Sequence, residues 1–226
     1  MRGLEFLTLD FTHICNLNCS HCGKFSDTAT WQMSDADLEL FLTYAPLSPA
    51  KNLRITGGDP LTHPKFRDYI TAILELIDKP LELATNGLWL PKYQDMIPLF
   101  LKVHITDYGD KNKWVIRRYG HLPQVNVISW SRYYSRDDDP HWLPSEARRL
   151  GYECCPLSQA NIVGARVYGC CLAEALTRHN HLDPDLTSVP LDAHWLETYQ
   201  AKDMIAACQH CFVAHDTIKN RSIQCL

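Results

Sequence analysis

Two spacings of apolar residues alternate along the first 130 residues of the chain. Short apolar runs bounded by polar residues predict β-strands, and the segments between them repeat apolar residues every three or four positions, which is typical of helices buried on one face. The predicted strands cover residues 5–10, 52–56, 81–85, 101–106 and 125–129. The predicted helices lie near 34–45, between Pro64 and Pro80, from Pro91 to Phe100 and near 111–119.

Local signals agree with these helices. Ser34 is a suitable N-cap, and Pro64 and Pro91 suit first helical positions because proline lacks the N–H that would go unpaired there. Five strands alternating with four helices favour a parallel sheet with helical crossovers. A doubly wound sheet and an open partial barrel both satisfy this pattern, whereas five units are too few for a closed eight-stranded barrel.

The pattern changes after about residue 130. Residues 131–142 are polar and aromatic, which predicts a loop, and a helix is expected near 144–150. Residues 161–169 predict a β-hairpin with Gly164 near its turn. The remaining chain looks irregular, with a short helix near 194–206.

Composition narrows the class of protein. The 226 residues are 46% hydrophobic and 21% charged, with a formal net charge of −4. We therefore expect a soluble globular protein, and the mild acidity argues against nucleic-acid binding, which favours a basic surface. The sequence has neither a membrane-spanning apolar run nor the features of a signal peptide, so a cytoplasmic location and no membrane partner are expected.

Ten cysteines are unusual for such a protein. Cytoplasmic thiols stay reduced, so this number points to metal rather than to disulfides. Three cysteines lie close together, and seven lie in the last third of the chain, which suggests two separate sites. The first group is Cys15, Cys19 and Cys22; the second is Cys154, Cys155, Cys170, Cys171, Cys208, Cys211 and Cys225.

The first group has the spacing Cys-x3-Cys-x2-Cys directly after the first predicted strand. Three thiolates on one tight loop can hold three irons of a [4Fe–4S] cluster and leave the fourth iron open. Electron-transfer clusters usually take four cysteines. A zinc site completed by His13 or His21 is the alternative, since structural zinc takes four ligands.

This spacing resembles the signature of radical S-adenosylmethionine (SAM) enzymes. A second motif agrees: Gly57-Gly58-Asp59-Pro60 resembles the family's Gly-Gly-Glu-Pro segment, with Asp59 in place of glutamate. The resemblance implies that this segment contacts the methionine amino group of SAM. It also implies weaker cofactor-binding roles near the adenine and ribose for His21, Asn86, Thr106 and Asp107.

The resemblance implies a fold and a chemistry. The fold is an α/β partial (β/α) TIM-like barrel of five or six parallel strands. The reduced cluster splits SAM to a 5′-deoxyadenosyl radical, which abstracts a hydrogen atom from a substrate. A low-potential electron donor such as flavodoxin or ferredoxin is the expected protein partner.

The second cysteine group resembles the "twitch" extension, a short relative of the SPASM domain that follows some radical SAM cores. The resemblance implies a second [4Fe–4S] cluster in a small C-terminal hairpin and helix domain, which divides the chain into residues 1–150 and 151–226. A four-cysteine zinc site is the alternative. The expected ligands are Cys155, Cys170, Cys208 and Cys211, with Cys154 or Cys171 possible instead.

An auxiliary cluster would allow oxidation, because it can accept an electron from a substrate radical. Relaying electrons to the first cluster and holding the C-terminal segment in place are the alternative roles. This layout is similar to that of an aminocyclitol dehydrogenase of the family, so we expect a small polar metabolite such as a sugar or aminocyclitol as substrate. Candidate catalytic residues in the loop after the fifth strand are Arg132, Tyr134 and His141. His104 in the fourth strand either faces the barrel interior or is a paired core histidine.

Two other functions stay open. Peptide modification is one, although many peptide-modifying members carry an additional N-terminal domain for which the residues before the first strand leave little room. The other is a cysteine-rich zinc or electron-transfer protein. Such a protein would not need the Gly57–Pro60 motif, which the SAM-binding hypothesis explains.

Overall fold

The structure is a computed structural model that describes residues 4–19, 22, 24, 26, 29–129, 159–170, 173–179 and 182–202. One mixed sheet runs through it in the order β5-β4-β3-β2-β1-β6-β7-β8. The strands are β1 (Phe6–Thr12), β2 (Asn52–Gly57), β3 (Leu81–Thr85), β4 (Lys102–Asp107), β5 (Val125–Ser129), β6 (Gln159–Val163), β7 (Arg166–Tyr168) and β8 (Ser188–Pro190).

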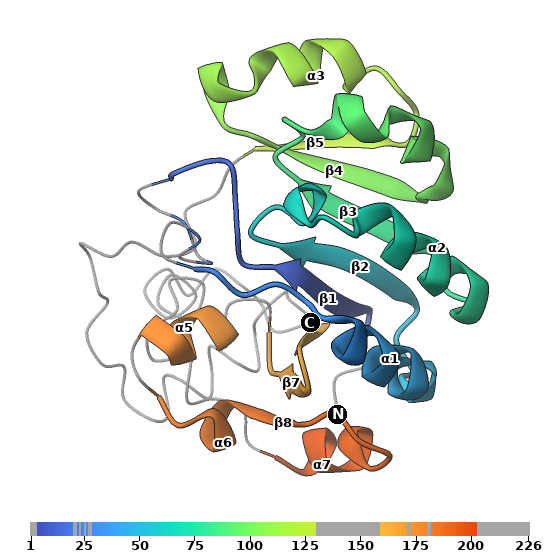
Figure 1. Cartoon of the computed structure of the whole chain (residues 1–226), viewed down its shortest axis with the longest axis vertical. Coiled ribbons are helices and arrows are strands. Elements are labelled where there is room, and N and C mark those ends of the chain that lie inside the picture. Colours follow the sequence, from blue (N-terminus) through green and yellow to red (C-terminus); the bar gives the residue numbers. More distant parts are fainter. Residues whose placement is uncertain are drawn as a thin grey trace, which may run out of the picture.

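Strands β1 to β6 are mutually parallel, and β7 and β8 add antiparallel strands at one edge. The five predicted strands are confirmed, and so is the open, partial-barrel α/β class (Figure 1). The sixth parallel strand is the first arm of the predicted hairpin, whose turn contains Gly164 at φ +55°. Residues 159–168 thus extend the main sheet; the division after residue 150 stays a prediction.

Helices α1 (Asp35–Tyr44) and α2 (Phe66–Leu76) cover one face of the sheet, while α5 (Ala173–His179) lies on the other side of it (Figure 1). The predicted Ser34 cap is confirmed as a capping box, in which Ser34 accepts from Asp37 N–H and the Asp37 side chain accepts from Ser34 N–H. The other helices are α3 (Lys113–Tyr119), α6 (Pro184–Thr187) and α7 (Trp195–Ala201), with 3₁₀ segments η1 (Ala45–Leu47), η2 (Pro60–Thr62), η3 (Leu90–Leu99) and η4 (Gly109–Lys111).

Two predicted helices differ from the structure. The segment after Pro91 is the 3₁₀ helix η3, with non-helical torsions at Tyr93, because Pro98 cannot supply the N–H that a continued α-helix requires. Helix α2 begins at Phe66, two residues after Pro64, and ends at Leu76, before Pro80. Lys65 is therefore the N-cap of α2, and the turn η2 (Pro60–Thr62) ends before Pro64.

The helix-covered face of the sheet is apolar. Phe11 is fully buried and makes edge-on ring contacts with His63, Phe66 and Tyr69 at 5.8 Å. This face forms the hydrophobic core with the helices, since its strand residues are all nearly inaccessible. These residues are Leu7, Leu9, Phe11, Leu53, Ile55, Leu81, Leu83, Val103, Ile105, Ala160 and Ile162.

The opposite face, called the polar face below, carries hydrophilic side chains on all six parallel strands. Closed barrels usually fill their interior with branched apolar residues, so this face is built for something other than packing. It is formed by Thr8 and Asp10, Arg54 and Thr56, Glu82, His104 and Thr106, Asn126, and Gln159 and Asn161.

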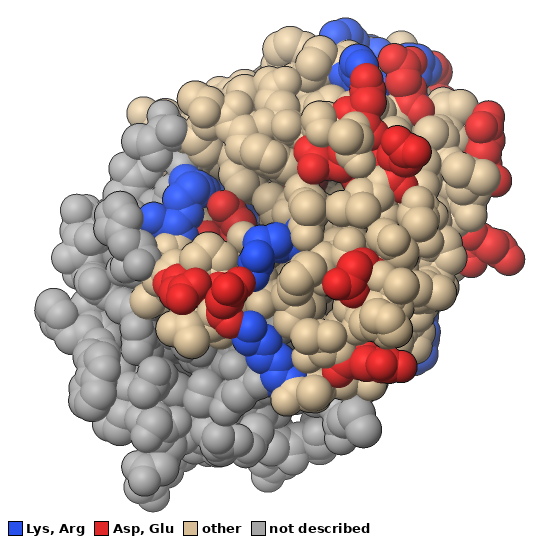
Figure 2. Space-filling view, turned by 60° about the horizontal axis from the view of Figure 1, so that its bottom comes forward, with Lys and Arg blue, Asp and Glu red and all other residues tan. Residues whose placement is uncertain are grey.

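The surface itself carries both signs of charge. In Figure 2, acidic and basic side chains are interspersed over the coloured part of the molecule. Within the residues described, no helix combines the length and the apolar character needed to cross a membrane.

Candidate functional site

The candidate site lies at the carboxyl edge of the parallel strands, where loops following β1, β2, β3 and β4 meet. In sheets of this kind the carboxyl edge is where ligands bind. The segment from Cys15 to Cys22, called the cysteine loop below, follows β1 directly.

Two glycines let the end of β2 approach the chain before the cysteine loop. Gly57 has φ +143°, and a Cβ there would lie 2.2 Å from the Thr12 carbonyl oxygen. A Cβ on Gly58 would lie 2.3 Å from the Ile14 carbonyl oxygen. The Gly58 N–H donates to the Thr12 carbonyl at 2.6 Å, and Asp59 N–H donates to that of Ile14 at 2.9 Å. The glycines therefore fix the start of the cysteine loop.

Asp59 is buried and joins the ends of β2 and β3. Its carboxylate accepts from Thr85 Oγ1 at 2.8 Å, from Asn86 N–H at 2.8 Å and from Leu61 N–H at 3.0 Å. Burial raises the pKa of Asp59 to about 6, although the three hydrogen bonds oppose the shift. The carboxylate is thus engaged within the chain, and contact of Asp59 or Pro60 with SAM stays a prediction.

Asn86 links β3 to the cysteine loop. Its Nδ2 donates to Asn16 Oδ1 at 2.7 Å and to Cys15 Sγ at 3.5 Å, and its Oδ1 accepts from Leu88 N–H at 2.9 Å. Leu17 N–H also donates to Cys15 Sγ, at 3.4 Å. Hydrogen bonds to cysteine sulfur stabilise the thiolate that ligates iron and tune a cluster's potential. Asn86 was predicted near SAM, and the structure places it against the first cysteine.

The three thiols differ in environment. Burial and the negative charge of Asp59 raise the pKa of Cys15 to about 12, and burial raises that of Cys19, which Lys111 opposes. Cys22 N–H donates to the Cys19 carbonyl at 3.2 Å, and the Cys22 thiol lies 3.8 Å from Ser26 Oγ. With their pKa values raised, Cys15 and Cys19 would release their protons as they bind a metal.

Three cysteines on one loop provide donors for a cubane cluster. Within the described chain, no three Cys, His, Asp or Glu side chains converge on one ion-sized point. A cubane binds each cysteine to a different iron, so its three sulfurs do not need to converge. The donor set is therefore suited to a [4Fe–4S] cluster.

Residues at and after the end of β4 complete the carboxyl edge of the sheet. Asn112 is fully buried, and its Nδ2 donates to the carbonyls of Asn86 at 2.8 Å and of Thr106 at 2.7 Å. Asp107 accepts from Gly109 N–H at 2.8 Å and is otherwise exposed. Burial, and then the nearby cysteines, raise the pKa of Tyr108. The ribose contacts predicted for Thr106 and Asp107 stay predictions.

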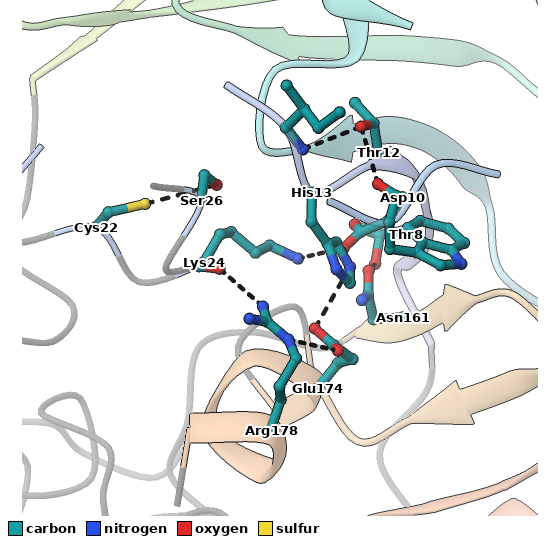
Figure 3. Close-up of polar contacts among 12 residues, drawn as sticks. Thr8, Asp10, Thr12, His13, Cys22, Lys24, Ser26, Asn161, Glu174 and Arg178 are labelled. Carbon is teal, nitrogen blue, oxygen red and sulfur yellow. Dashed lines mark hydrogen bonds and ion pairs between the residues drawn. The ribbon is translucent and has the colours of Figure 1, made fainter. Parts of the chain in front are cut away.

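A buried ion pair holds the far end of the cysteine loop. Lys24, two residues after Cys22, donates to Asp10 Oδ2 at 2.7 Å (Figure 3). Asp10 is fully buried on β1. Burial alone would raise the pKa of Asp10, but the positive charge of Lys24 and the nearby His13 ring outweigh it and lower the pKa. The carboxylate is therefore charged and anchors the loop to the polar face.

The same network reaches helix α5 (Figure 3). His13 Nε2 lies 3.6 Å from Asp10 Oδ2 and 3.4 Å from Glu174 Oε2. Arg178 donates to Glu174 Oε1 at 3.1 Å and to the Lys24 carbonyl at 3.1 Å. Helix α5 begins three residues after Cys170, whose carbonyl accepts from Ala173 N–H at 3.1 Å. The network therefore connects the first cysteine group to the segment that carries a predicted ligand of the second.

His104 belongs to a second polar row on the polar face. Its Nε2 is 2.9 Å from Glu82 Oε2, and its Nδ1 is 3.2 Å from Asn126 Nδ2. Arg54 donates to the same Glu82 oxygen through Nε at 3.0 Å and Nη2 at 2.6 Å. The sequence predicted His104 either as a paired histidine or as a residue facing the barrel interior. The structure shows that it is paired and that it also lies on the polar face.

Several predicted residues lie outside the described part of the chain, and their roles stay predictions. They are His21, Arg132, Tyr134, His141, Cys154, Cys155, Cys171, Cys208 and Cys211. Sequence reasoning in turn missed Asp10, Lys24, Asn112, Glu174 and Arg178. Asp10 carried a signal, because a carboxylate inside a predicted parallel strand needs a buried partner.

Comparison with known proteins gives consistent results. A model of the Radical SAM superfamily matches residues 9–129, more than half of the chain. A structure of BtrN in complex with AdoMet and 2-DOIA superposes on 98% of this chain and 91% of its own, with TM-score 0.61 and 16% identity. Streptococcus suis SuiB bound to precursor peptide SuiA superposes on 95% and 71%, with TM-score 0.50 and 10% identity. At such identities these likenesses show the fold.

Curated relatives share a shorter segment. A probable GTP 3′,8-cyclase of Methanothermobacter thermautotrophicus is 33% identical over 97 residues, 41% of this chain and 30% of that protein. The GTP 3′,8-cyclase of Geobacter sulfurreducens is 31% identical over 96 residues, 40% and 29% of the two chains. The chain therefore matches about three tenths of the length of these relatives.

Proposed function

The chain belongs to the radical SAM superfamily, and from this premise we propose that it oxidises a small polar metabolite by two electrons. One observation supports the proposal most strongly. The cysteine loop, which hydrogen bonds of Gly58 and Asn86 hold in place, borders the polar face of the sheet. The first feature suits a cluster with an open iron. The second suits a hydrophilic substrate next to it.

In this proposal Cys15, Cys19 and Cys22 hold a [4Fe–4S] cluster at which SAM binds. When bound, cluster and SAM supply a 5′-deoxyadenosyl radical, as in the family. The chain's own residues position the cysteine ligands. Asn86 orients Cys15, and the Asp10–Lys24 ion pair holds the far end of the cysteine loop. The Gly58 carbonyl, to which no described residue donates, is a candidate acceptor for the amino group of SAM.

We place the second [4Fe–4S] cluster on Cys155, Cys170, Cys208 and Cys211, with Cys154 or Cys171 as alternatives. Its purpose is to take one electron. A substrate alcohol carbon would lose a hydrogen atom to the adenosyl carbon, its hydroxyl proton to a base, and one electron to the second cluster. The product is a ketone, and the single electron that cleaves SAM comes from an external donor such as flavodoxin or ferredoxin.

The neighbours support different substrates. BtrN, which superposes over nearly its whole length, is described with AdoMet and 2-DOIA, whereas SuiB is described with a precursor peptide. The curated relatives named GTP 3′,8-cyclase match only part of this chain, so a GTP reaction rests on less of the molecule. We favour oxidation because of the additional cysteines and the hydrophilic sheet face; cyclisation of GTP and peptide modification are the alternatives.

Anaerobic reconstitution tests the proposal directly. About eight irons per chain are expected for two cubanes, and about four for one. The Cys208→Ala variant should keep SAM cleavage after reduction with dithionite and lose about half of its iron, while Cys225→Ala should match the wild type. Zinc without iron at the first group, or no 5′-deoxyadenosine from reduced wild type, would refute radical chemistry.

The reaction type needs a second measurement. Deuterium transfer from a labelled candidate into 5′-deoxyadenosine identifies the substrate, and mass spectrometry of the product distinguishes loss of two hydrogens from cyclisation or peptide crosslinking. A product two mass units lighter than a polyol substrate supports the oxidation. Turnover of GTP or of a peptide instead would replace it with one of the alternatives.

A further inference from the structure

Unpaired polar atoms gather at one corner of the polar face. Folded proteins pair nearly all buried polar groups, so each unpaired one calls for an explanation. Here five buried side-chain atoms lack a hydrogen-bond partner among the described residues, and all belong to β1, to the residue just after it, to β6 or to α5. They are Asp10 Oδ1, His13 Nε2, Gln159 Nε2, Asn161 Nδ2 and Glu174 Oε2.

Three of these residues lie close to the cysteine loop. His13 Nε2 is 3.4 Å from Glu174 Oε2, but the two atoms do not form a well-aligned hydrogen bond. Asp10 lies on β1 two residues beyond Thr8, and Lys24 ties it to the chain just after Cys22. These groups therefore lie next to the two ends of the cysteine loop.

Asn161 joins this corner from β6. It pairs with Thr8 across the sheet, and Thr8 Oγ1 donates to Asn161 Oδ1 at 2.6 Å. This bond fixes the carboxamide, so that Nδ2 is left without an acceptor although Asn161 is fully buried. A buried donor without an acceptor destabilises the fold unless something binds it.

Charge indicates what would bind there. Lys24 and Arg178 neutralise Asp10 and Glu174 through Oδ2 and Oε1, so that Asp10 Oδ1 and Glu174 Oε2 have no hydrogen bond among the described residues, although His13 Nε2 lies 3.4 Å from Glu174 Oε2. Two carboxylate acceptors and one amide donor suit hydroxyl and amino groups. A phosphate would meet two anionic oxygens, which disfavours a nucleoside triphosphate at this corner.

We propose that Asp10, Asn161 and Glu174 bind hydroxyl or amino groups of an uncharged or cationic polyol substrate beside the cysteine loop. This inference rests on the proposed function and deepens it by assigning the chain's substrate-recognising residues. The competing explanation is ordered water, which often pairs with buried polar groups.

Gln159 provides a matched control, because it tests whether any buried, unpaired carboxamide that binds water or has a structural role gives the same result as Asn161. It is a buried carboxamide with an unpaired Nε2 on the same strand and face as Asn161, but it lies two residues farther from the cysteine loop, opposite Phe6. Thr8 Oγ1 also lies 3.1 Å from the Ala160 carbonyl, so Asn161→Leu leaves it an acceptor. Both Asn161→Leu and Gln159→Leu are therefore expected to fold.

The test uses anaerobically reconstituted full-length protein with SAM. Melting temperatures are measured with myo-inositol, 2-deoxystreptamine or GTP at millimolar concentration, for wild type, Asn161→Leu and Gln159→Leu. At least one of the two polyols should stabilise wild type and Gln159→Leu, and its apparent affinity should fall about tenfold or more in Asn161→Leu. Without ligand, both variants should melt at or above the wild-type temperature.

Three results would overturn the inference: stabilisation by GTP alone, no stabilisation by either polyol, or an equal response of all three proteins to a polyol. Formation of 5′-deoxyadenosine by dithionite-reduced wild type is measured in parallel without substrate. This measurement distinguishes failure of the substrate assignment from failure of the radical SAM function. If it forms while the polyols fail, the substrate assignment is wrong and the radical SAM function stands. If it does not form, the proposed function itself fails.

Discussion

The two faces of the parallel sheet follow different rules. On the helix-covered face, residues such as Leu9, Ile55 and Val103 are fully buried in a continuous core. On the polar face, the neighbouring positions carry Asp10, Arg54 and other hydrophilic side chains joined by hydrogen bonds. Parallel strands usually bury apolar residues on both faces. Here apolar and polar side chains alternate along the strands, which separates the face that stabilises the fold from the face that we propose binds substrate.

This separation makes the two kinds of residue testable independently. Substitutions in the apolar core should lower the free energy of unfolding without a specific effect on chemistry. Substitutions at the carboxyl edge or on the polar face should change chemistry or binding with smaller effects on stability. The buried Asp10–Lys24 pair contributes to both, because it lies on the polar face and closes the cysteine loop.

The largest expected effect is loss of SAM cleavage without loss of the fold. Cys19→Ala removes one of the three proposed iron ligands on a loop outside the core, so 5′-deoxyadenosine formation should fall below detection and iron content should fall by about four per chain. Chromatography of the products of the dithionite-reduced protein measures 5′-deoxyadenosine formation, and Cys225→Ala is the control. Cleavage retained by Cys19→Ala would contradict the ligand assignment.

A large effect of the opposite kind is expected in the core. Phe11→Ala removes a fully buried ring that contacts three aromatic side chains, and the cavity should lower the free energy of unfolding by about 3–5 kcal/mol. SAM cleavage per folded molecule should change little. Denaturant unfolding measures the loss, and Leu76→Ala, whose side chain is 63% exposed, is the control. Equal effects of both substitutions would mean that this face is not the core.

These two faces also show what sequence can predict. Apolar periodicity predicted all five strands before residue 130 and the Ser34 cap, because those signals are local. Strand β6 was expected only as a hairpin arm; its pairing with β1 joins residues about 150 positions apart and leaves no local signal. The short elements β8 and α6 were missed for the same reason, since tertiary contacts decide segments of three or four residues.

The site divides in a similar way. Spacing predicts Cys15, Cys19 and Cys22 as ligands because a cluster constrains its ligands on one loop, and the assignment stays a prediction. Spacing did not identify Asn112 or Glu174, whose roles depend on partners in distant segments. For Gly57 the motif predicted contact with SAM, which stays a prediction; the contact that the structure shows is with the Thr12 carbonyl.

An intermediate effect is expected where the two roles meet. Lys24→Met leaves the buried Asp10 carboxylate without its cation, which should cost about 3 kcal/mol of unfolding free energy and slow SAM cleavage by loosening the cysteine loop. The exposed pair of Lys51 with Glu5 is the matched control, and Lys51→Met should cost less than about 1 kcal/mol. If both lysines prove equivalent, the Asp10 pair does not anchor the loop.

Adding Asp10→Asn to Lys24→Met should restore part of the stability, since the unpaired charge is then absent. A double variant as unstable as the sum of the two single variants would show that Lys24 and Asp10 act separately. The measurement is denaturant unfolding of all four proteins at one state of cluster loading.

The smallest effect, and the sharpest test of the polar face, is a pH dependence at Glu82. Burial alone would raise the pKa of Glu82, but hydrogen bonds from His104 and Arg54 outweigh it and lower the pKa below 4.5. Its contribution to stability is therefore complete above pH 4.5, the unfolded value, and is lost as the pH falls through the lower folded value. Glu82→Gln should cost about 1 kcal/mol near neutral pH, and the difference from wild type should shrink as the solution becomes more acidic.

Unfolding free energies of wild type, Glu82→Gln and the exposed control Glu75→Gln, compared at equal cluster loading from pH 7 downward, measure this difference. Glu75→Gln should show almost none. A gap between wild type and Glu82→Gln that stays constant with pH would mean that packing, rather than the charge of Glu82, holds the row of Arg54, His104 and Asn126. In that case the polar face would resemble the apolar face more closely than its hydrogen bonds indicate.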